Sequence, residues 1–501
     1  MRERENQLIG SASRGMWILT FHSMCVRILR KNATEVGYGQ NFTIYDDTDQ
    51  KRLIKIICAD LEINTKIFSE NMIRAMISTA KNELQTPDEF EGLQNDPPHQ
   101  VAALVYHEYQ KRLQIANAMD FDDLLMLAYQ LFLKHPEILE MYQNRFKYIL
   151  IDEYQDTNKA QYLITKMLAA KHQNIMVVGD DDQSIYSWRG ADIRNILGFE
   201  KDYPNCKVVK LQQNYRSTAN ILDAANAVIK NNFSRKAKTL FTEGEQGAKI
   251  AIYTAATERD EGRWVASEVE KRHLRGASYN DIAVFYRTNV QSRVLEDMMI
   301  RAGINYKIVG GVKFFERAEI KDVMAYLTLI VNPTDDIACH RIINTPRRGL
   351  GKTTIQNIDD IARLHGCSFL DACKMCAMDV NVRERVRKAL YDFCELVAKN
   401  QAKFSGRNAN TEIVPLDAGE DQSLRAKIEA YIKETGIINA LSAEQTTEAD
   451  ARIDNIDEFF GVIDEFSQNH KSEDELYEAP SEGDNEPQRV LRGTSLVDFL
   501  E

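Results

Sequence analysis

The sequence lacks several features that would assign it to a class of protein. No run of about 18 apolar residues occurs in its 501 residues, so a membrane-spanning helix is not expected. Residues Met1 to Glu5 are mostly charged or polar and lack the apolar core of a signal peptide, which argues against secretion. Cysteine is sparse, and eight cysteines spread over this length do not make a disulfide framework. We therefore expect a cytoplasmic protein without a membrane partner.

An excess of positive charge is also missing. Lys and Arg number 63 against 75 Asp and Glu, which gives a formal net charge of −12. Taken alone, this net charge argues against a protein whose surface is covered with basic residues that bind nucleic acid. The charge is uneven, however, because residues 471–487 hold seven acids and one lysine, whereas residues 230–238 are basic. A locally positive groove can bind nucleic acid on an acidic protein, so the net charge does not decide the question.

Two apolar segments end abruptly in acidic residues. Residues 148–151 lead into Asp152 and Glu153, and residues 176–179 lead into three consecutive aspartates. In a parallel α/β sheet, the carboxyl ends of the strands form the edge where ligands bind. Asp152 can hold Mg²⁺ through oxygen, and Glu153 can orient or deprotonate an attacking water. The pattern indicates nucleotide hydrolysis; the alternative is an ordinary helix N-cap followed by an acid in the first turn.

Polar and aromatic side chains follow the second apolar segment. Gln183, Tyr186, Trp188 and Arg189 supply an amide, two flat aromatic faces and a cation. This mixture suits a site that senses phosphate and stacks single-stranded bases. The two aromatic residues could instead belong to a core, and Gln183 could be a surface amide. The polar neighbours of the two rings favour an exposed stacking surface.

An ordered series of motifs resembles the UvrD/Rep/PcrA-type superfamily I DNA helicases. The motifs lie at residues 20–23 (Thr-Phe-His-Ser), 119–125, 148–157, 176–190, 213–217 (Gln-Asn-Tyr-Arg-Ser), 286–293 and 310–322. A lone Asp-Glu pair would be a weak signal, whereas this series in this order is specific and extends over almost the whole chain. The resemblance implies an α/β fold of two RecA-like, P-loop NTPase-type units with parallel sheets, each carrying a mainly helical insertion.

The resemblance and the alternation of strand and helix patterns suggest the following domains. Residues 1–31 would begin the first RecA-like domain, 32–123 would be its helical insertion, and 124–213 would continue it. Residues 214–313 would form part of the second RecA-like domain, and 314–501 its helical insertion, with an acidic loop near 471–488. Strands are expected at residues 17–21, 146–151, 175–178, 208–211, 250–253, 282–286 and 306–309. The apolar spacing over residues 453–466 predicts a helix that faces a core.

The same resemblance implies roles at a site for ATP and Mg²⁺. Asp152 would be the Mg²⁺ ligand, Glu153 the catalytic carboxylate, and Gln183 the sensor of the γ-phosphate. From the second unit, Tyr215 would stack on the adenine and Arg216 would reach the γ-phosphate. An arginine from a neighbouring domain stabilises transition-state charge and links catalysis to domain closure. Without the resemblance, Tyr215 and Arg216 read as a loop tyrosine and a solvated arginine.

The expected macromolecular partners are single-stranded DNA and single/double-strand junctions, with repair or replication proteins as further candidates. Contacts between such side chains and the phosphates of the DNA backbone position a DNA strand without specifying its sequence. The simpler alternative for Thr20 and His22 is that they end a strand and cap the next helix. The residues expected to bind DNA are Thr20, His22, Tyr186, Trp188, Arg189, Arg287, Asn289 and Arg293.

The chain departs from the family pattern at both ends. Such helicases carry a phosphate-binding loop, Gly-x-x-x-x-Gly-Lys-Ser/Thr, ahead of the Thr-Phe-His-Ser motif, and the residues before Thr20 contain none. The family's last two motifs are also not found before Glu501. We therefore expect a truncated ATP-dependent 3′→5′ helicase with impaired ATPase activity. The alternative is a non-catalytic, DNA- or partner-binding remnant of such a helicase.

Residues 348–354 contain the chain's Gly-Lys-Thr sequence but do not fit a phosphate loop. Pro346 stands where the first glycine of the loop would be, and proline has no N–H to offer a phosphate. We favour a turn between helices that touches duplex DNA.

One group of residues could suggest zinc, because its ligand count would suit that metal. The apolar neighbours of these residues favour a helix with buried thiols, and we expect no metal there. The residues are His365, Cys367, Cys373 and Cys376.

Overall fold

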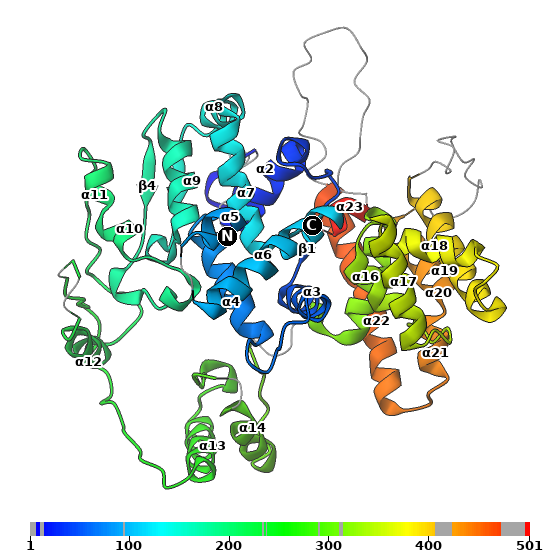
Figure 1. Cartoon of the computed structure of the whole chain (residues 1–501). Helices are drawn as coiled ribbons and strands as arrows, with labels where there is room; N and C mark the ends of the chain where they lie inside the picture. The colour runs from blue at the N-terminus through cyan, green and yellow to red at the C-terminus, as the bar shows by residue number, and fades with distance from the viewer. Residues whose placement is uncertain are drawn as a thin grey trace. The chain divides into compact units, whose positions relative to one another are not determined.

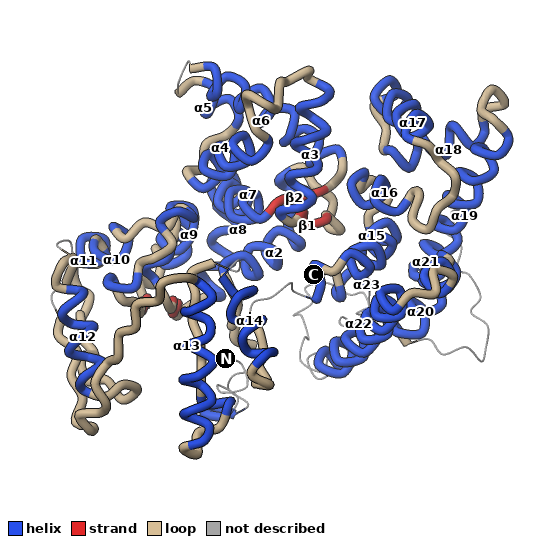
Figure 2. Tube along the Cα trace, turned by 90° about the horizontal axis from the view of Figure 1, so that it is seen from below, coloured by secondary structure: helices blue, strands red, loops and turns tan. Residues whose placement is uncertain are grey.

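In the computed structural model, the chain divides into two compact units. One consists of Met1–Phe199 and Ala318–Glu501, and the other of Glu200–Arg317. The structure describes residues 7–10, 15–93, 96–232, 235–236, 238–288, 291–309, 314–405, 423–471 and 496–500. Helices dominate these ranges, and their strands form two short parallel pairs (Figures 1 and 2). None of the described helices is both long enough and apolar enough to cross a membrane.

The larger unit is built mainly from helices with two strand pairs between them. Its N-terminal elements are α2 (Phe21–Asn32), β1 (Thr43–Tyr45), α3 (Asp47–Asp60), α4 (Glu70–Asn82), α5 (Pro87–Glu91), α6 (Pro97–Ile115), β2 (Ala118–Asp120), α7 (Phe121–Lys134), α8 (Pro136–Arg145), β3 (Ile149–Ile151), α9 (Lys159–Ala169), β4 (Ile175–Val177) and α10 (Arg194–Leu197). Its C-terminal helices are α15 (Ala318–Val331), α16 (Asp336–Ile342), α17 (Lys352–His365), α18 (Phe369–Met378), α19 (Glu384–Ser405), α20 (Leu424–Thr435), α21 (Ile437–Ser442), α22 (Thr447–Lys471) and α23 (Leu496–Phe499). Helix α11 (Phe199–Asp202) lies at the boundary with the smaller unit.

Two apolar cores hold the N-terminal part of this unit. Helices α2, α7, α8 and α9 pack on one another around residues such as Ile28, Leu131 and Ile164. Helices α3, α4 and α6 enclose the second core, which includes Ile57 and Tyr106. Helix α7 is common to both groups, because it contacts α4 as well as α2 and α9. The helical insertion is therefore packed directly on the part of the unit that carries β3 and β4.

Segments that are far apart in the sequence, by 216 to 290 residues, meet in the larger unit. The Asn332 amide nitrogen donates to Thr43 Oγ1 at 2.8 Å and to the Ala116 carbonyl oxygen at 2.9 Å. The buried Tyr45 hydroxyl donates to Asp335 Oδ1 at 2.9 Å. The loop between α15 and α16 is thus hydrogen-bonded to the β1–β2 pair.

The C-terminal helices agree with two expectations from the sequence. Helix α22 covers residues 453–466, and Ile456, Phe459 and Ile463 on it are buried, which confirms a core-facing helix. Cys373 and Cys376 are buried on α18, as expected for core thiols. The acidic segment expected near 471–488 lies, from residue 472 onward, outside the described residues.

The smaller unit contains α12 (Ala219–Ile229), α13 (Glu258–Leu274) and α14 (Ser292–Arg301). Helices α13 and α14 pack on each other around a small cluster that includes Val269 and Met299.

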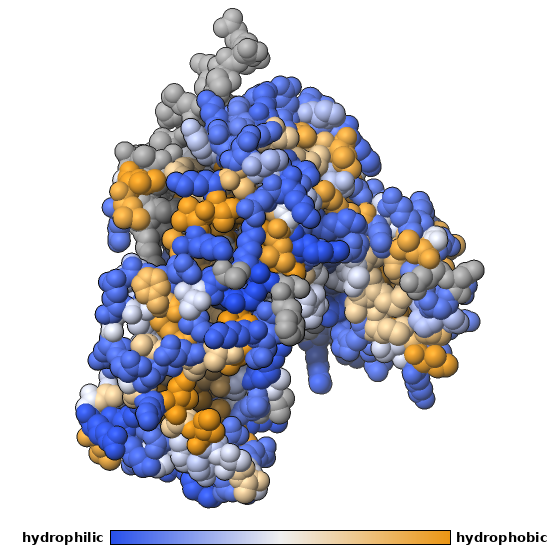
Figure 3. Space-filling model, turned by 90° about the vertical axis from the view of Figure 1, so that its left-hand side faces the viewer, coloured by the Kyte–Doolittle hydropathy of each residue, from blue (hydrophilic) through white to orange (hydrophobic). Residues whose placement is uncertain are grey.

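The strand expectations are confirmed at β3 and β4 and are wrong elsewhere. Residues 17–21, 208–211, 250–253, 282–286 and 306–309 form no strand. A strand needs a hydrogen-bonded neighbour, and these segments lack the ladder that would pair them. Their apolar side chains are accordingly exposed in several places, as at Ile252 (91%) and Phe285 (93%). Apolar patches also interrupt the polar surface on the face drawn in Figure 3.

Candidate functional site

The candidate site lies where β3 and β4 end. The two strands pair in parallel with Ile149 opposite Ile175 and Ile151 opposite Val177. Backbone hydrogen bonds continue past them: Val178 N–H donates to the Ile151 carbonyl at 2.8 Å. The carboxyl ends of both strands therefore lie side by side, as the sequence predicted.

Asp152 and Glu153 leave the end of β3 as exposed carboxylates. Asp152 Oδ1 accepts a hydrogen bond from Glu153 N–H at 3.0 Å. Glu153 has a positive φ of 52°, a left-handed conformation that is uncommon for a non-glycine residue. Such strain is often found at functional sites. Glu153 stands at the N-cap position of the short 3₁₀ turn Tyr154–Asp156, but its side chain makes no capping hydrogen bond there. The next long helix, α9, has its own N-cap, Asn158, which forms a capping box. Neither carboxylate of the pair therefore caps α9.

Gln155 joins the two strand ends, and its role was not anticipated from the sequence. Its side chain is buried, with Nε2 donating to Glu153 Oε2 at 2.8 Å and Oε1 accepting from Asp180 N–H at 3.0 Å. A Cβ at Gly179 would lie only 2.5 Å from Gln155 Oε1, so glycine leaves the space that this amide occupies. Burial, and then the charge of Glu153, raise the pKa of Asp156 beside it. The amide within an otherwise acidic run was the available signal in the sequence.

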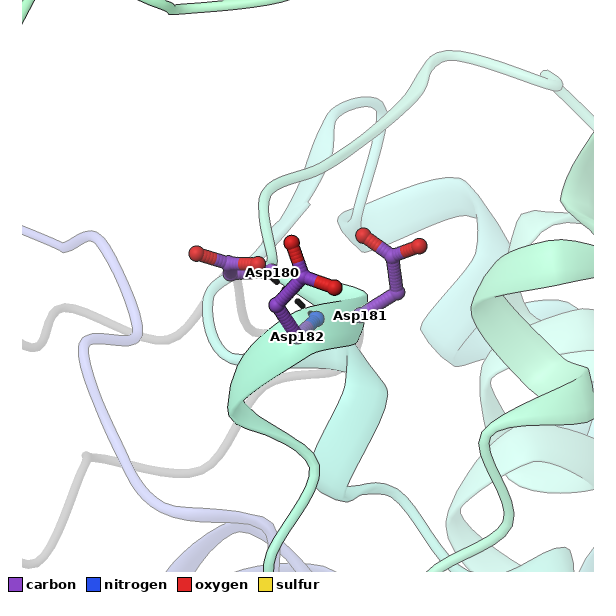
Figure 4. Close-up of side chains that lie close together, drawn as sticks. All are labelled: Asp180, Asp181 and Asp182. Carbon is purple, nitrogen blue, oxygen red and sulfur yellow. Dashed lines mark hydrogen bonds between the residues drawn. The ribbon is translucent and has the colours of Figure 1, made fainter. Parts of the chain in front are cut away.

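Three aspartates form the turn after β4. Oxygen atoms of Asp180, Asp181 and Asp182 lie within 4.8 Å of one another (Figure 4). Asp180 accepts hydrogen bonds from Asp182 N–H at 2.9 Å and from Gln183 Nε2 at 2.8 Å. The first aspartate is therefore engaged in holding the turn and in directing Gln183.

The carboxylates at the two strand ends fit a magnesium ion chemically. Mg²⁺ prefers oxygen ligands and usually takes one or two carboxylates together with phosphate oxygens and water. Asp152 is exposed, and the hydrogen bond to its Oδ1 comes from the adjacent backbone, so its carboxylate is accessible to such an ion. Its assignment as the ligand stays a prediction.

The two aromatic residues after the acidic turn are exposed, as the sequence predicted. Tyr186 is 40% and Trp188 67% exposed, and their ring centroids lie 6.5 Å apart with planes inclined at 42°. Trp188 sits on a short 3₁₀ turn, Ser187–Arg189, which ends at Gly190 with φ +84°. The side chain of Arg189 is outside what the structure describes. Both aromatic side chains therefore lie at the surface.

Thr20 and His22 take local structural roles at the start of α2. Thr20 is the N-cap, with Oγ1 accepting from Ser23 N–H at 3.2 Å. His22 is half-buried with its ring edge-on to Phe121 at 5.7 Å between centroids. Burial lowers the pKa of His22, which favours the neutral ring. The capping role that the sequence allowed for Thr20 is confirmed, and DNA contact by either residue stays a prediction.

The remaining expected site residues lie on the smaller unit. Tyr215 and Arg216 are exposed after an Asx turn in which Asn214 Oδ1 accepts from Arg216 N–H at 2.9 Å. Arg287 and Arg293 are also exposed. Asn289 lies outside the described residues. Contact of these side chains with nucleotide or DNA stays a prediction.

The turn at residues 348–354 keeps its simpler explanation. Arg348 donates from Nη1 to the Ile342 carbonyl at 2.8 Å and from Nη2 to the Tyr326 hydroxyl at 2.6 Å. Its guanidinium therefore braces the turn between α16 and α17, which confirms a turn between helices. Contact of this turn with duplex DNA stays a prediction.

Comparison with known proteins places the whole chain in one family. The UvrD/REP helicase N-terminal domain matches residues 1–204, and the UvrD-like helicase C-terminal domain matches residues 209–492. The chain is 46% identical over 475 residues to the ATP-dependent DNA helicase PcrA of Bacillus subtilis (strain 168), covering 95% of this chain and 62% of that protein. It is 44% identical to the protein of the same name from Staphylococcus aureus (strain Mu50 / ATCC 700699), covering 95% of this chain and 63% of the relative. It thus spans less than two thirds of the length of these relatives. With its mixed helical and parallel-strand structure, the chain belongs to the UvrD/REP helicase family.

Proposed function

We propose that the protein is an ATP-dependent DNA helicase or translocase of the UvrD type. It would move 3′→5′ on single-stranded DNA, engage single/double-strand junctions, and act in the cytoplasm in repair or replication. Two RecA-like units would carry the nucleotide chemistry. The family membership supports the activity, and the polarity follows the family resemblance alone.

In this proposal the described side chains divide the work by position. Asp152 would hold Mg²⁺, which would neutralise charge on the phosphates of bound ATP. Glu153 would orient and deprotonate the attacking water, and Gln183 would respond to the γ-phosphate. Tyr215 and Arg216 would contact the adenine and the γ-phosphate from the smaller unit. Gln155 would keep the ends of β3 and β4 in register.

The DNA site in this proposal centres on the exposed ring faces of Tyr186 and Trp188. Stacking of a base on an aromatic side chain is worth about 1–3 kcal/mol and tolerates any base. Arg189, Arg287 and Arg293 would add sequence-independent contacts with phosphates, so binding should weaken as salt rises.

The observation that carries the proposal is the bonded junction of the two strand ends. Gln155 contacts Glu153 through one end of its amide and the Asp180 backbone through the other. The candidate water-activating carboxylate and the turn that directs Gln183 are therefore mechanically linked. A nucleotide sensed at Gln183 could influence Glu153, and the reverse, through a single buried side chain.

We further propose that the 501-residue polypeptide hydrolyses ATP negligibly. Phosphoryl transfer depends mainly on positioning and charge stabilisation, and the loop that supplies backbone N–H groups and a lysine to the phosphates is not found in the sequence. A non-catalytic DNA-binding role is the second candidate, favoured by the same observation.

A phosphate-release assay with Mg²⁺, ATP and oligo-dT tests both statements. The 501-residue chain should show negligible turnover. A chimera extended at both ends with the corresponding segments of the Bacillus subtilis relative should turn over and be stimulated by DNA. Glu153→Gln in the chimera should lower turnover by about 10²–10⁴-fold, the usual effect of removing a general base. The exposed control Glu137→Gln should have no effect. Robust turnover by the unextended chain would refute the proposal that it hydrolyses ATP negligibly. An unaffected Glu153→Gln chimera would refute the proposed role of Glu153 in ATP hydrolysis.

A further inference from the structure

The end of helix α4 is bonded to the starts of two other helices. Lys81 Nζ lies 2.7 Å from Asp120 Oδ2 and 2.8 Å from Asp123 Oδ1, at the start of α7. Lys159, the first residue of α9, donates to the Glu83 carbonyl at 3.1 Å and to its carboxylate at 3.2 Å. Three consecutive residues of the helical insertion thus meet the elements that lead to the candidate site.

Asn82, the middle residue of the three, uses both ends of its amide. Its Nδ2 donates to Asp122 Oδ1 at 2.9 Å and to the Ser78 carbonyl at 2.8 Å. Its Oδ1 accepts from Asn158 Nδ2 at 2.5 Å. Asn158 is buried and is the N-cap of α9, where it forms a capping box with Gln161. Asn82 is therefore hydrogen-bonded both to α7 and to the N-cap of α9.

Gly190 faces this link. A Cβ at Gly190 would lie 3.7 Å from Asn82 Cβ and 4.0 Å from Asn158 Cβ. The same glycine closes the turn that carries Trp188, with its N–H donating to the Ser187 carbonyl at 3.0 Å. An added methyl group at Gly190 would therefore just touch the Asn82–Asn158 pair, so the backbone of the aromatic turn faces this pair.

Hydrogen bonds anchor the chain just after Gly190. Asp192 N–H donates to the Thr157 carbonyl at 3.0 Å, and Asn195 Nδ2 donates to the same carbonyl at 2.9 Å. The segment after Gly190 is thus tied to residue 157, next to Asn158. This anchor of the aromatic turn depends on where the start of α9 lies.

We propose that Asn82 is a positioning residue that holds the aromatic turn, residues 184–190, in the conformation that binds single-stranded DNA. It deepens the proposed function, because it rests on DNA stacking at Tyr186 and Trp188. Asn82 does not itself contact DNA. It acts by fixing the start of α9, next to Thr157, to which the segment that follows the turn is hydrogen-bonded, and it transmits movements of the helical insertion to the turn.

The polarity of the Asn82 contacts suggests a selective test. Asn82 donates to the Asp122 carboxylate, so Asn82→Asp would place two carboxylates face to face. Adding Asp122→Asn would restore a donor and an acceptor between the two side chains with their directions exchanged, while the oxygen facing Asn158 is kept. The bond from residue 82 to the Ser78 carbonyl, which lies within α4 itself, is lost in both variants. Asn158→Ser removes the donor to Asn82 but retains a residue that caps helices well. Asn64→Asp is a matched control, because it makes the same charge change at an exposed position of the same insertion.

The experiment is fluorescence anisotropy of labelled oligo-dT with the full chain. Asn82→Asp should weaken binding by about tenfold, within the range for loss of one stacking face. The Asn82→Asp/Asp122→Asn variant should bind within about twofold of the unmodified chain, the usual limit of additivity errors. In a Trp188→Ala background, Asn82→Asp should have little further effect, because the stacking face that it positions is already gone. A brace that merely stabilises the fold would not show this non-additivity.

Each outcome bears on the proposal. Three results would each overturn the positioning role. The first is unchanged binding by Asn82→Asp, and the second is no rescue when Asp122→Asn is added. The third is a loss of affinity from Asn82→Asp in the Trp188→Ala background that equals its loss in the unmodified chain. If Asn82→Asp does not fold, Asn158→Ser decides by the same criteria. Trp188→Ala alone reports on the proposed function: if it binds normally, stacking on the turn is wrong and the positioning role fails with it. A loss with Trp188→Ala but none with Asn82→Asp would leave the proposed function standing and refute only the role of Asn82.

Discussion

Replacement of Lys81 by methionine should strongly destabilise the larger unit. The Lys81 side chain is fully buried, and its ammonium is the cation that pairs with both Asp120 and Asp123. Burial lowers the pKa of Lys81, but the two carboxylates outweigh it, so the net shift is upward and the charged form is favoured. Methionine matches much of the side-chain volume without the charge. The substitution would leave two buried carboxylates close together with no cation.

The expected loss can be worked from these contacts. Removing one partner of a buried ion pair costs about 3–5 kcal/mol, because the remaining charge is uncompensated. Four donors would persist at this site. The Tyr109 hydroxyl lies 3.0 Å from Asp120 Oδ2, and Gln110 Nε2 lies 3.1 Å from Asp123 Oδ1. The backbone N–H groups of Asp120 and Asp123 each donate to the carboxylate of the other residue, at 3.1 and 2.8 Å. We therefore expect a loss near the lower end, about 3 kcal/mol in the free energy of unfolding.

The loss should also depend on pH in a defined direction. Burial, and then the charge of Asp120, raise the pKa of Asp123 to about 7, although Lys81 opposes the shift. Without Lys81 this pKa should rise further. A carboxyl group with a raised pKa in the folded state contributes stability below its unfolded pKa and loses it as the pH rises through the folded value. The deficit of Lys81→Met should therefore be smaller at about pH 5 than at about pH 8.

Urea denaturation followed by far-UV circular dichroism at both pH values measures this effect. Lys66→Met, at an exposed position of the same insertion, is the control and should change little. A variant that also carries Asp120→Asn and Asp123→Asn should recover part of the stability, because no unpaired charge remains. A loss below about 1 kcal/mol, the size expected for an exposed pair, would refute the reasoning. So would a deficit that grows on acidification.

Three further substitutions give separate tests. Trp188→Ala should weaken oligo-dT binding, measured by anisotropy, by about 5–150-fold, which corresponds to about 1–3 kcal/mol of stacking. Trp188→Phe should keep most of the affinity. Equal affinities of the Trp188→Ala variant and the unmodified chain would exclude stacking at this position. Gly179→Ala should destabilise the chain by about 1–3 kcal/mol in urea, because its Cβ would meet Gln155 Oε1 at 2.5 Å, and an unchanged urea midpoint would show that the amide can move aside. Asn332→Leu should leave the Ala116 carbonyl without this donor and cost about 1–3 kcal/mol, seen as faster proteolysis between α15 and α16; a protease-resistant variant would count against that contact.

The sequence predicted those parts of the site that depend on local pattern. Apolar runs that end in acids located β3, β4 and their adjoining carboxylates, and polar neighbours indicated correctly that Trp188 is exposed. Helical spacing similarly located the buried face of α22. In each case the residues that determine the structure are close together in the chain, so periodicity carries the information.

Long-range contacts could not be predicted in this way. Lys81 looks like a solvated lysine near the end of a helix, and its burial depends on acids about 40 residues later. The contact of Asn332 with Thr43 joins segments with no shared pattern. In the smaller unit the sequence instead predicted strands that the structure does not form. Their composition favours strands, but a strand also requires a partner, which composition does not specify.

The discontinuous larger unit has a consequence for synthesis on the ribosome. Residues 200–317 separate its two portions, so roughly 118 residues must be made after Phe199 before Ala318 emerges. At about 5–20 residues per second this takes roughly 6–24 s. Throughout that interval Tyr45 and the β1–β2 pair are without Asp335 and Asn332, the hydrogen-bonding groups of the later portion. The nascent chain therefore exposes polar groups that lack their final hydrogen-bonding partners for many seconds. A chaperone could recognise the chain during this period, and pausing of translation would prolong it.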